Sequence, residues 1–570
     1  MTRSVPIFSL HPAMASMESP SYVSPSVTPR ARPGVYPNDP PAATRSDEPI
    51  SRESKCFILA DMDRAAWPDN RVCGDCSARL RPEQRRYTVE MSSGSGCKIC
   101  DLKASKPEAL TQPFLQFLTE NPTIFHAVDY FKGRMNSVGF TELPARDDWS
   151  DKIQPGGKYY VTRNGSTLAA FIVGEAYKPG NGVAMIAGHI DALTAKLKPV
   201  SKKPTKAGFV QLGVAPYAGA LNETWWDRDL SIGGRVVVRD AETGKTTTKL
   251  VKLGWPIAKI PTLAPHFGVG MTGAQNKETQ VVPVIGLESS SSDEALGEVG
   301  TFVASQPPKL VKLIASELGI KPQNYGSIVN WELELFDFQP ATVAGMDKEL
   351  ISAGRIDDKL CSWAALTGLL YSDSAPTDSG IKLVALFDDE EIGSLLRQGA
   401  RGNFLPSVIE RTVEALSAQA GKTFGPGVVG QTYARSFLVS ADVTHAANPN
   451  FLEKYQSEHL PLLNVGITIC ADSNGHMTTD SVSTAVCSRV AELSGCKNQL
   501  FMIRNDSRSG GTVGPMLSSA MGVKTVDAGL PQLSMHSIRA TTGALDPGLG
   551  AKWFKGFLDN WEKIDAEWDH

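Results

Sequence analysis

The sequence contains four consecutive carboxylic acids, Asp-Asp-Glu-Glu at residues 388–391, which are its densest group of chemically active side chains. They directly follow residues 383–387, an apolar run of the kind that a fully buried strand needs, and Gly393 permits a sharp turn. Adjacent acids at the end of a buried strand would repel one another by ~4 kcal/mol per pair at an effective dielectric constant of about 20. Such a group needs a cation, which beside buried carboxylates is usually a metal ion. Considered alone, the stretch could also be a solvated acidic turn.

Other candidate ligands occur where predicted strands end or helices begin. His189 follows the apolar run 182–187, and Asp191 lies two residues later on the same side of an extended chain, where it could orient the histidine. In open α/β sheets the site lies beyond the carboxyl ends of the strands, so ligands from distant segments can converge there. Two histidines with several carboxylates suit zinc or manganese used for hydrolysis. The candidate ligands are His189, Asp357, Glu390, Glu391, Asp442 and His536.

The residue patterns around these candidates predict the elements that position them. Apolar residues at helical spacing begin near residue 107, and strands alternate with helices from residue 346 to the C-terminus, which predicts an α/β fold with a mostly parallel sheet. Residues 192–342 instead show alternating apolar positions separated by glycine-containing turns, the pattern of antiparallel strands. We therefore expect a catalytic domain of residues 106–191 and 343–570, interrupted by an inserted, mainly β domain of residues 192–342.

Residues 1–105 are expected to form a disordered N-terminal extension, because the first half of this segment is rich in proline, serine, threonine and arginine. Within it, two Cys-x-x-Cys pairs match the spacing of a structural four-cysteine zinc knuckle. The intervening stretch is polar and poor in apolar residues, so a disordered tail with incidental cysteines is the alternative. The cysteines of these pairs are Cys73, Cys76, Cys97 and Cys100. The cysteines expected to be core thiols are Cys361, Cys470, Cys487 and Cys496.

The composition argues against several classes of function. The chain has 570 residues and a net charge of -4, which gives no electrostatic footprint for nucleic acid or for an anionic membrane surface. No apolar run approaches the ~18 residues of a membrane span, so membrane insertion is not expected. The N-terminus is interrupted by prolines and has no adequate apolar region for a secretory signal peptide, so we expect synthesis in the cytoplasm.

The ordered set of motifs resembles the aspartyl aminopeptidase family of metallopeptidases, which comprises the aspartyl aminopeptidases and the fungal vacuolar aminopeptidase I. The resemblance extends from about residue 106 to the C-terminus, and residues 192–270 are most similar to the vacuolar branch. It implies a metalloaminopeptidase with a zinc-exopeptidase core, an inserted oligomerisation domain and assembly into tetrahedral dodecamers. The segments that carry the resemblance are 188–191, 355–357, 387–394, 440–445, 504–507, 511–515 and 531–537.

By this resemblance, two zinc ions would occupy the site, with manganese or cobalt able to replace them. Asp357 would bridge the two ions. His189 and Glu391 would complete the ligands of the first ion. Asp442 and His536 would complete those of the second.

The resemblance also implies roles for residues beside the ligands. Glu390 would be the general base that activates the attacking water and passes its proton to the leaving amine. Asp191 would support the first histidine, and Asp358 stands where many relatives have asparagine. His445, which closely follows a ligand, could contact substrate. His266 would reach the active site of a neighbouring subunit.

The N-terminal residue that the enzyme removes is expected to be neutral or apolar. Between residues 461 and 488, after the Asp442 ligand, the sequence has no lysine or arginine to meet an acidic side chain, whose burial without a countercharge costs several kcal/mol. The main alternative is an aspartyl aminopeptidase that prefers Asp or Glu. Another two-zinc hydrolase, and an assembly or cargo protein with reduced catalysis, are further alternatives. By analogy with the vacuolar branch, the extension is expected to be removable and the location vacuolar, with the cytoplasm as the alternative.

Overall fold

The computed structural model describes residues 106–267, 275–288, 296–372 and 375–569, all of which belong to one unit of the chain, Asp69–His570. The predicted N-terminal extension, residues 1–105, lies outside the described residues, and so do Cys73, Cys76, Cys97 and Cys100. Within the part of the chain that is described, no helix is both long enough and apolar enough to cross a membrane.

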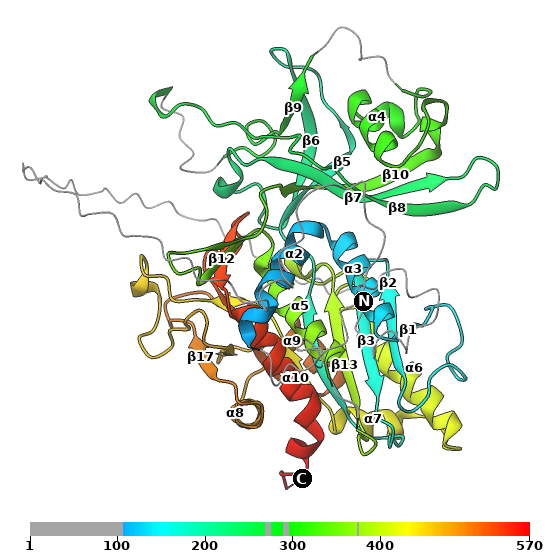
Figure 1. Ribbon diagram of the computed structural model, residues 1–570, viewed down its shortest axis with the longest axis vertical. Helices are drawn as coiled ribbons and strands as arrows, with labels where there is room; N and C mark the ends of the chain where they lie inside the picture. The colour runs from blue at the N-terminus through cyan, green and yellow to red at the C-terminus, as the bar shows by residue number, and fades with distance from the viewer. Residues whose placement is uncertain (1–105, 268–274, 289–295, 373–374, 570) are drawn as a thin grey trace, which may run out of the picture. The chain divides into compact units, whose positions relative to one another are not determined.

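The largest element is a nine-stranded sheet whose strands lie in the order β1-β2-β3-β13-β4-β14-β18-β16-β17 (Figure 1). The four adjacent strands β13, β4, β14 and β18 are parallel to one another. The predicted α/β fold class with a mostly parallel sheet is therefore confirmed. The bounds are β1 Thr141–Glu142, β2 Lys158–Arg163, β3 Thr167–Val173, β4 Val183–His189, β13 Ile381–Phe387, β14 Phe437–Ser440, β16 Ile467–Ala471, β17 Asn498–Met502 and β18 Lys524–Gly529.

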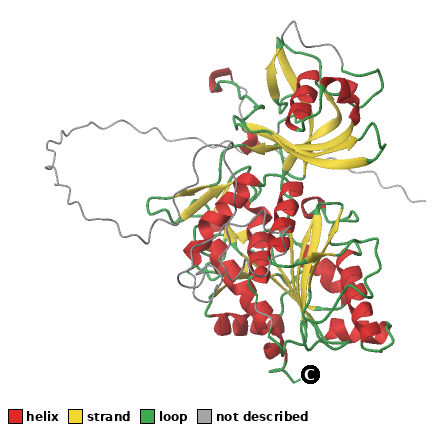
Figure 2. Ribbon diagram, turned by 45° about the vertical axis from the view of Figure 1, so that its right-hand side comes forward, coloured by secondary structure: helices red, strands yellow, loops and turns green. Residues whose placement is uncertain are grey.

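Helices cover both faces of this sheet (Figure 2), because its central strands are apolar on both sides. In β13, Val384 and Leu386 point into one hydrophobic core, whereas Leu383 and Phe387 point into the other. Both β4 and β13 are buried along their whole length, which explains their continuous apolar runs. One core contains helices α2 (Thr111–Glu120), α3 (Ile124–Ser137), α5 (Ile356–Leu370), α8 (Ser481–Ser494) and α10 (Asp546–Asp565), and the other contains α6 (Phe404–Gln419), α7 (Pro426–Ala434) and α9 (Val513–Met521).

Six antiparallel strands form a second sheet, in the order β8-β7-β10-β5-β6-β9. Antiparallel strands were predicted for this stretch from its alternating apolar positions. Helix α4 (Pro308–Glu317) packs against the sheet in a hydrophobic core separate from the other two. The bounds are β5 Thr194–Lys202, β6 Phe209–Tyr217, β7 Leu230–Arg239, β8 Thr246–Lys252, β9 Val284–Leu287 and β10 Ile328–Asp337.

Two small sheets adjoin the remaining site segments. A three-stranded sheet joins β11 (Thr342–Ala344), β12 (Leu350–Ala353) and β20 (Ala540–Gly543), and Asp357 follows β12 at the start of α5. A parallel pair joins β15 (Thr444–His445) to β19 (Pro531–Gln532), and His536 follows β19. The short 3-10 helices are η3 Pro107–Leu110, η4 Glu223–Trp225, η5 Pro265–Phe267, η6 Val303–Ser305, η7 Pro322–Ser327, η8 Glu390–Ile392 and η9 Leu452–Lys454.

Candidate active site

Most of the candidate ligands come from three adjacent parallel strands. Strand β4 ends with His189, and its neighbour β13 ends with Phe387, which pairs with His189. The 3-10 helix η8, which begins with Glu390 and Glu391, follows β13 directly, and Asp442 comes two residues after β14. Because the three strands are parallel and adjacent, their carboxyl ends bring these side chains to one edge of the sheet.

His189 lies at the centre of the site, and only 1% of its side chain is exposed. Its Nε2 atom is 3.2 Å from Asp357 Oδ1, 3.5 Å from Asp442 Oδ1 and 3.8 Å from Glu390 Oε2. Burial by itself lowers the pKa of His189. The surrounding carboxylates, Asp442 foremost, outweigh burial and raise this pKa well above its usual value. The histidine therefore faces an excess of negative charge.

His536 reaches the same group of carboxylates from the segment after β19. Its Nε2 atom is 3.6 Å from Asp357 Oδ2 and 3.8 Å from Glu391 Oε2. Asp357 thus faces one histidine with each of its two oxygens, as a bridging carboxylate must. These distances group His189 with Asp442, and His536 with Glu391, whereas the resemblance implied the opposite pairing. The ligand atoms of His189, Asp357 and Glu391 also lie within 4.8 Å of one another.

Glu390 and Glu391 are adjacent in sequence but differ in their surroundings. The side chain of Glu390 is 14% exposed, whereas that of Glu391 is 5% exposed. Burial is the main reason that the pKa of Glu390 is raised to about 8 and that of Glu391 to about 10, and neighbouring carboxylates add to both shifts. Glu391 Oε1 is buried and has no hydrogen-bond partner among the described residues.

These donor atoms fit a divalent metal such as zinc. They are imidazole nitrogens and carboxylate oxygens, the usual ligands of catalytic zinc. Among the described residues, the buried Oε1 atom of Glu391 has no hydrogen-bond partner, and the raised pKa values of both glutamates reflect burial and repulsion that a cation would relieve.

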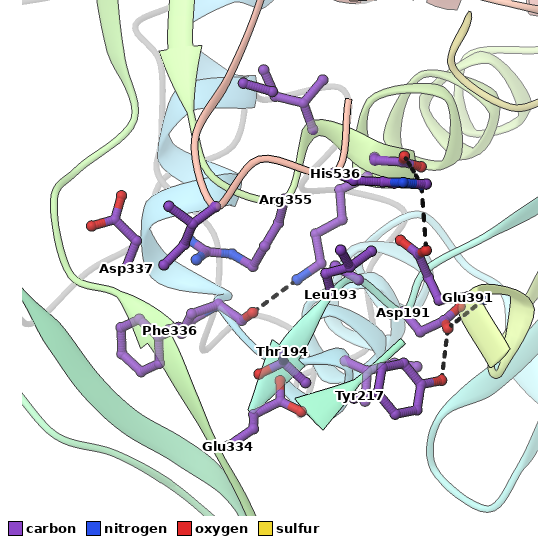
Figure 3. Close-up of a pocket in the computed structure, with 18 of the residues that line it drawn as sticks. Asp191, Leu193, Thr194, Tyr217, Glu334, Phe336, Asp337, Arg355, Glu391 and His536 are labelled. Atoms are coloured by element: carbon purple, nitrogen blue, oxygen red, sulfur yellow. Dashed lines mark hydrogen bonds and ion pairs between the residues drawn. The ribbon is translucent and has the colours of Figure 1, made fainter. Parts of the chain in front are cut away.

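Asp191 fixes the orientation of His189. Its Oδ1 atom is 3.2 Å from His189 Nδ1 and accepts the backbone N–H of Glu390, while its Oδ2 atom accepts the backbone N–H of Glu391. Oδ2 also accepts the hydroxyl of Tyr217 at 2.7 Å (Figure 3). Burial by itself raises the pKa of Asp191. The hydrogen bonds, first of all the one with His189, outweigh burial and hold this pKa below its usual value. With Asp191 accepting the hydrogen of Nδ1, Nε2 is left free to bind a metal.

A cleft of about 360 Å³ opens beside this group of residues. It is bordered by Asp357, Glu390, Glu391 and Asp442. Its other walls are largely apolar. The wall residues that a substrate side chain would meet are Met477, Phe501, Ile503, Arg508 and Met535. The volume is that of a site for a single amino-acid side chain and the adjoining peptide.

Comparison with known proteins decides the family. A family model described as Aminopeptidase I zinc metalloprotease (M18) matches residues 117–558. The chain belongs to this family. Vacuolar aminopeptidase 1 of Saccharomyces cerevisiae is 43% identical to it over 472 residues, which cover 81% of this chain and 90% of the relative. The aspartyl aminopeptidase of Aspergillus oryzae is 41% identical over 485 residues, which cover 79% of this chain and 96% of the relative.

Solved structures of this aminopeptidase family share the fold. The mApe1 structure from Chaetomium thermophilum matches with a TM-score of 0.77 and 66% sequence identity, over 81% of this chain and 100% of that chain. The mApe1 dodecamer of S. cerevisiae matches with a TM-score of 0.71 and 39% identity, over 81% of this chain and 98% of that chain. The predicted family and the predicted enzyme class, a zinc metalloaminopeptidase, are therefore confirmed.

The structure also places the other predicted site residues of this M18 enzyme. His445 lines the cleft, and its ring centroid is 5.9 Å from that of Phe501. His266 is exposed on η5 and stacks on Phe267, and nothing in the described part of this chain links it to the cleft. Its predicted role therefore requires a second subunit.

Asp358, the residue after the candidate bridging ligand Asp357, is fully buried. Its Oδ1 atom accepts the backbone N–H of Val443, and its Oδ2 atom has no hydrogen-bond partner among the described residues. Burial, followed by the nearby Asp442, raises the pKa of Asp358 well above its usual value. A raised pKa favours the protonated carboxyl, which offers both a donor and an acceptor, as an asparagine amide also does.

Sequence reasoning missed Phe501, Ile503, Met535 and Arg508. The substrate pocket was predicted within residues 461–488, but these four residues follow that segment. A signal was available, because Ile503 directly follows β17, and the segments after parallel strands are those that border such sites.

Proposed function

We propose that this protein is a two-zinc aminopeptidase that removes neutral or apolar residues from the N-termini of peptides. The observation that carries the proposal is the position of Asp357, whose two oxygens face His189 and His536 separately. One ion would be held by His189, Asp357 and Asp442. The other would be held by Asp357, Glu391 and His536. Zinc bound there supplies a Lewis acid that polarises the scissile carbonyl and makes water more acidic.

Two residues of the chain carry out the proton and orientation steps in this proposal. Glu390 is the more exposed of the two glutamates and borders the cleft, so its carboxylate takes the proton of the attacking water and returns it to the leaving amine. The more buried Glu391, with its unpaired oxygen, is the ligand. Asp191 holds the His189 ring so that Nε2 points at the carboxylates. Manganese or cobalt could replace zinc in the same donor set.

The walls of the cleft support a preference for neutral residues. Met477, Phe501 and Met535 offer apolar surface, and the buried acid Asp527 in the same wall offers no positive charge to an acidic substrate. Arg508 is the one lysine or arginine among the described residues that line the cleft, and it is exposed to solvent. The presence of Arg508 therefore favours the second candidate, an aminopeptidase for Asp and Glu, and the Aspergillus relative is named an aspartyl aminopeptidase.

Hydrolysis of matched substrates tests both parts of the proposal. We expect cleavage to require a free N-terminal amine, and kcat/KM to be higher for leucine than for aspartate or glutamate. Arg508→Met should leave the rate for leucine substrates unchanged within about twofold and should abolish residual activity on acidic ones. A preference of more than tenfold for Asp or Glu, worth ~1.4 kcal/mol, would refute the neutral pocket. Cleavage of N-acetylated peptides would refute the aminopeptidase.

The domain organisation and assembly complete the proposal. Residues 106–191 and 343–570 form the catalytic domain, and residues 192–342 form an inserted domain through which chains associate. Support comes from the dodecamer of the S. cerevisiae relative and from large apolar side chains that this domain exposes. The exposed residues are Trp255, Leu263, Phe267 and Leu287. Light scattering that shows an active particle of ~60 kDa would contradict assembly.

The location proposed for the enzyme is the vacuole, with the cytoplasm as the alternative. It is supported by the similarity to a vacuolar aminopeptidase. The N-terminal extension is proposed to be removable and unnecessary for catalysis. A chain that begins at residue 106, folds normally and lacks activity would contradict this part of the proposal.

A further inference from the structure

One segment of the inserted domain, residues 217–225, contacts the supports of both histidines of the site. We propose that this segment positions His189 and His536, so that the second sheet sets the metal affinity of the active site. The inference rests on the proposed metal site and goes beyond it, because it gives the inserted domain a role inside each subunit.

The first contact runs through Tyr217, the last residue of β6. Its hydroxyl donates to Asp191 Oδ2 at 2.7 Å (Figure 3). It lies 3.4 Å from Asp389 Oδ1, so the bond to Asp191 is the shorter. The other oxygen of Asp191 faces His189 Nδ1. Without Tyr217, Oδ2 would keep a single contact, the backbone N–H of Glu391 at 3.2 Å. The bond from Tyr217 therefore helps to aim the carboxylate at the histidine ring.

Two contacts with strand β5 hold Tyr217 in place. Its side chain is 7% exposed, and its position in β6 is fixed by pairing with Thr194 of β5. Lys196, also on β5, places its Nζ atom 3.9 Å from the centroid of the tyrosine ring. The aromatic ring is thus held by the second sheet, while its hydroxyl reaches a carboxylate of the catalytic core.

The second contact runs through Asn222 and Thr224, which hold the backbone of His536 and of the residues that directly follow it. Asn222 Nδ2 donates to His536 O at 3.0 Å, and Thr224 Oγ1 accepts the N–H of Ile538 at 2.9 Å. The two side chains are joined, because Thr224 Oγ1 donates to Asn222 Oδ1 at 2.6 Å.

His536 needs this support more than most residues. Its φ angle is +63°, a left-handed conformation that is unfavourable for a residue with a Cβ atom. Its side chain is 56% exposed, so packing of the imidazole does little to hold it. The backbone bonds from Asn222 and Thr224 are therefore important for keeping the ring near Asp357.

The segment is anchored in the second sheet by a buried tryptophan. Trp225 is 1% exposed and lies in the hydrophobic core of that sheet, and Ile538 from the His536 loop packs into the same core. Movement of the second sheet would therefore act on the supports of both histidines through residues 217–225.

Zinc affinity of the full-length protein, measured by competition with a chelator, tests the inference. Tyr217→Phe and Asn222→Asp should each weaken zinc binding by ~10- to 100-fold, the usual effect of losing a residue that orients a metal ligand. Asn222→Asp keeps the acceptor for Thr224 and removes the donor to His536. For both variants, excess zinc should restore most of kcat with KM nearly unchanged, and light scattering should show an unchanged particle size.

Two matched controls remove a similar group elsewhere. Tyr160→Phe deletes a buried hydroxyl bonded to Asn136, and Asn181→Asp deletes an amide donor to Ser379 O, so both should bind zinc like the wild type. The inference is refuted if Tyr217→Phe and Asn222→Asp bind zinc as tightly as the wild type while His189→Ala loses zinc. It is also refuted if the two variants lose zinc only from dissociated subunits. If His189→Ala keeps both ions, the proposed metal site itself is wrong.

Discussion

Replacement of Glu390 by glutamine tests the proposed division of roles between two adjacent glutamates. Glutamine has nearly the same shape as glutamate but cannot accept the proton. Among the described residues, the closest charged partner of the Glu390 carboxylate is His189 Nε2 at 3.8 Å, so the substitution breaks little of the structure. We expect Glu390→Gln to keep both zinc ions and to lower kcat by ~10² to 10⁴, the usual contribution of general acid–base catalysis. This range corresponds to about 3 to 5 kcal/mol of activation free energy.

Glu391→Gln is the matched comparison, because it makes the same chemical change one residue away. The Glu391 carboxylate lies 3.8 Å from His536 Nε2 and has a buried, unpaired oxygen, so this variant should lose one zinc ion per chain. Zinc content after dialysis and kcat at saturating substrate are measured for both variants. If Glu390→Gln loses zinc and keeps its rate per bound ion, the roles of the two residues are exchanged and the reasoning fails.

Three further predictions follow from the distances and charges in the structure. Asp442→Ala and His536→Ala should each retain one zinc ion, and the combined variant should retain none; equal zinc loss in the single and combined variants would mean that both residues hold the same ion. Burial, followed by two nearby lysines, lowers the pKa of His126 to about 4, below its unfolded value of about 6.5, so the unfolded chain takes up the proton first as the pH falls. This lowers the free energy of unfolding by about 2 kcal/mol at pH 5, and His126→Gln should remove that loss. Denaturation curves at pH 7 and pH 5 measure the free energy of unfolding of the wild type and the variant. The same change between the two pH values in both proteins would contradict the prediction. His266→Ala should lower activity without changing zinc content if this histidine completes a neighbouring subunit's site, and unchanged activity in the assembled enzyme would exclude that role.

The catalytic core could be predicted because its central strands leave a strong pattern. A strand covered by helices on both faces must be apolar at every position, and β13 and β4 therefore stand out as continuous apolar runs that end abruptly in acids or in histidine. His189, Glu390 and Glu391 were recognisable as candidate ligands from their positions at these two ends. Asp357, Asp442 and His536 were recognisable from their positions beside other predicted strands and helices. His189, expected just after the strand, is the last residue of β4, because the pairing with β13 continues through Phe387.

Other parts of the site could not be predicted, because they depend on contacts between distant segments. The proposed grouping of each histidine with a carboxylate depends on the path of the chain after β14 and β19, which no local pattern records. Tyr217 and Asn222 lie in a stretch where alternation predicts only β structure, and their partners are 26 and 314 residues away. The arginine at the cleft, Arg508, follows β17 in a segment without periodic apolar residues.

The two histidines differ greatly in their access to water, and this has a kinetic consequence. His189 is 1% exposed, whereas His536 is 56% exposed. An ion bound beside His536 would have one ligand that is open to solvent, whereas an ion bound beside His189 would be held by a histidine that is almost fully buried. Brief treatment with a chelator should therefore yield a long-lived, half-filled enzyme, with its remaining ion on the His189 side. Isotopically labelled zinc added to that species would enter the other position first.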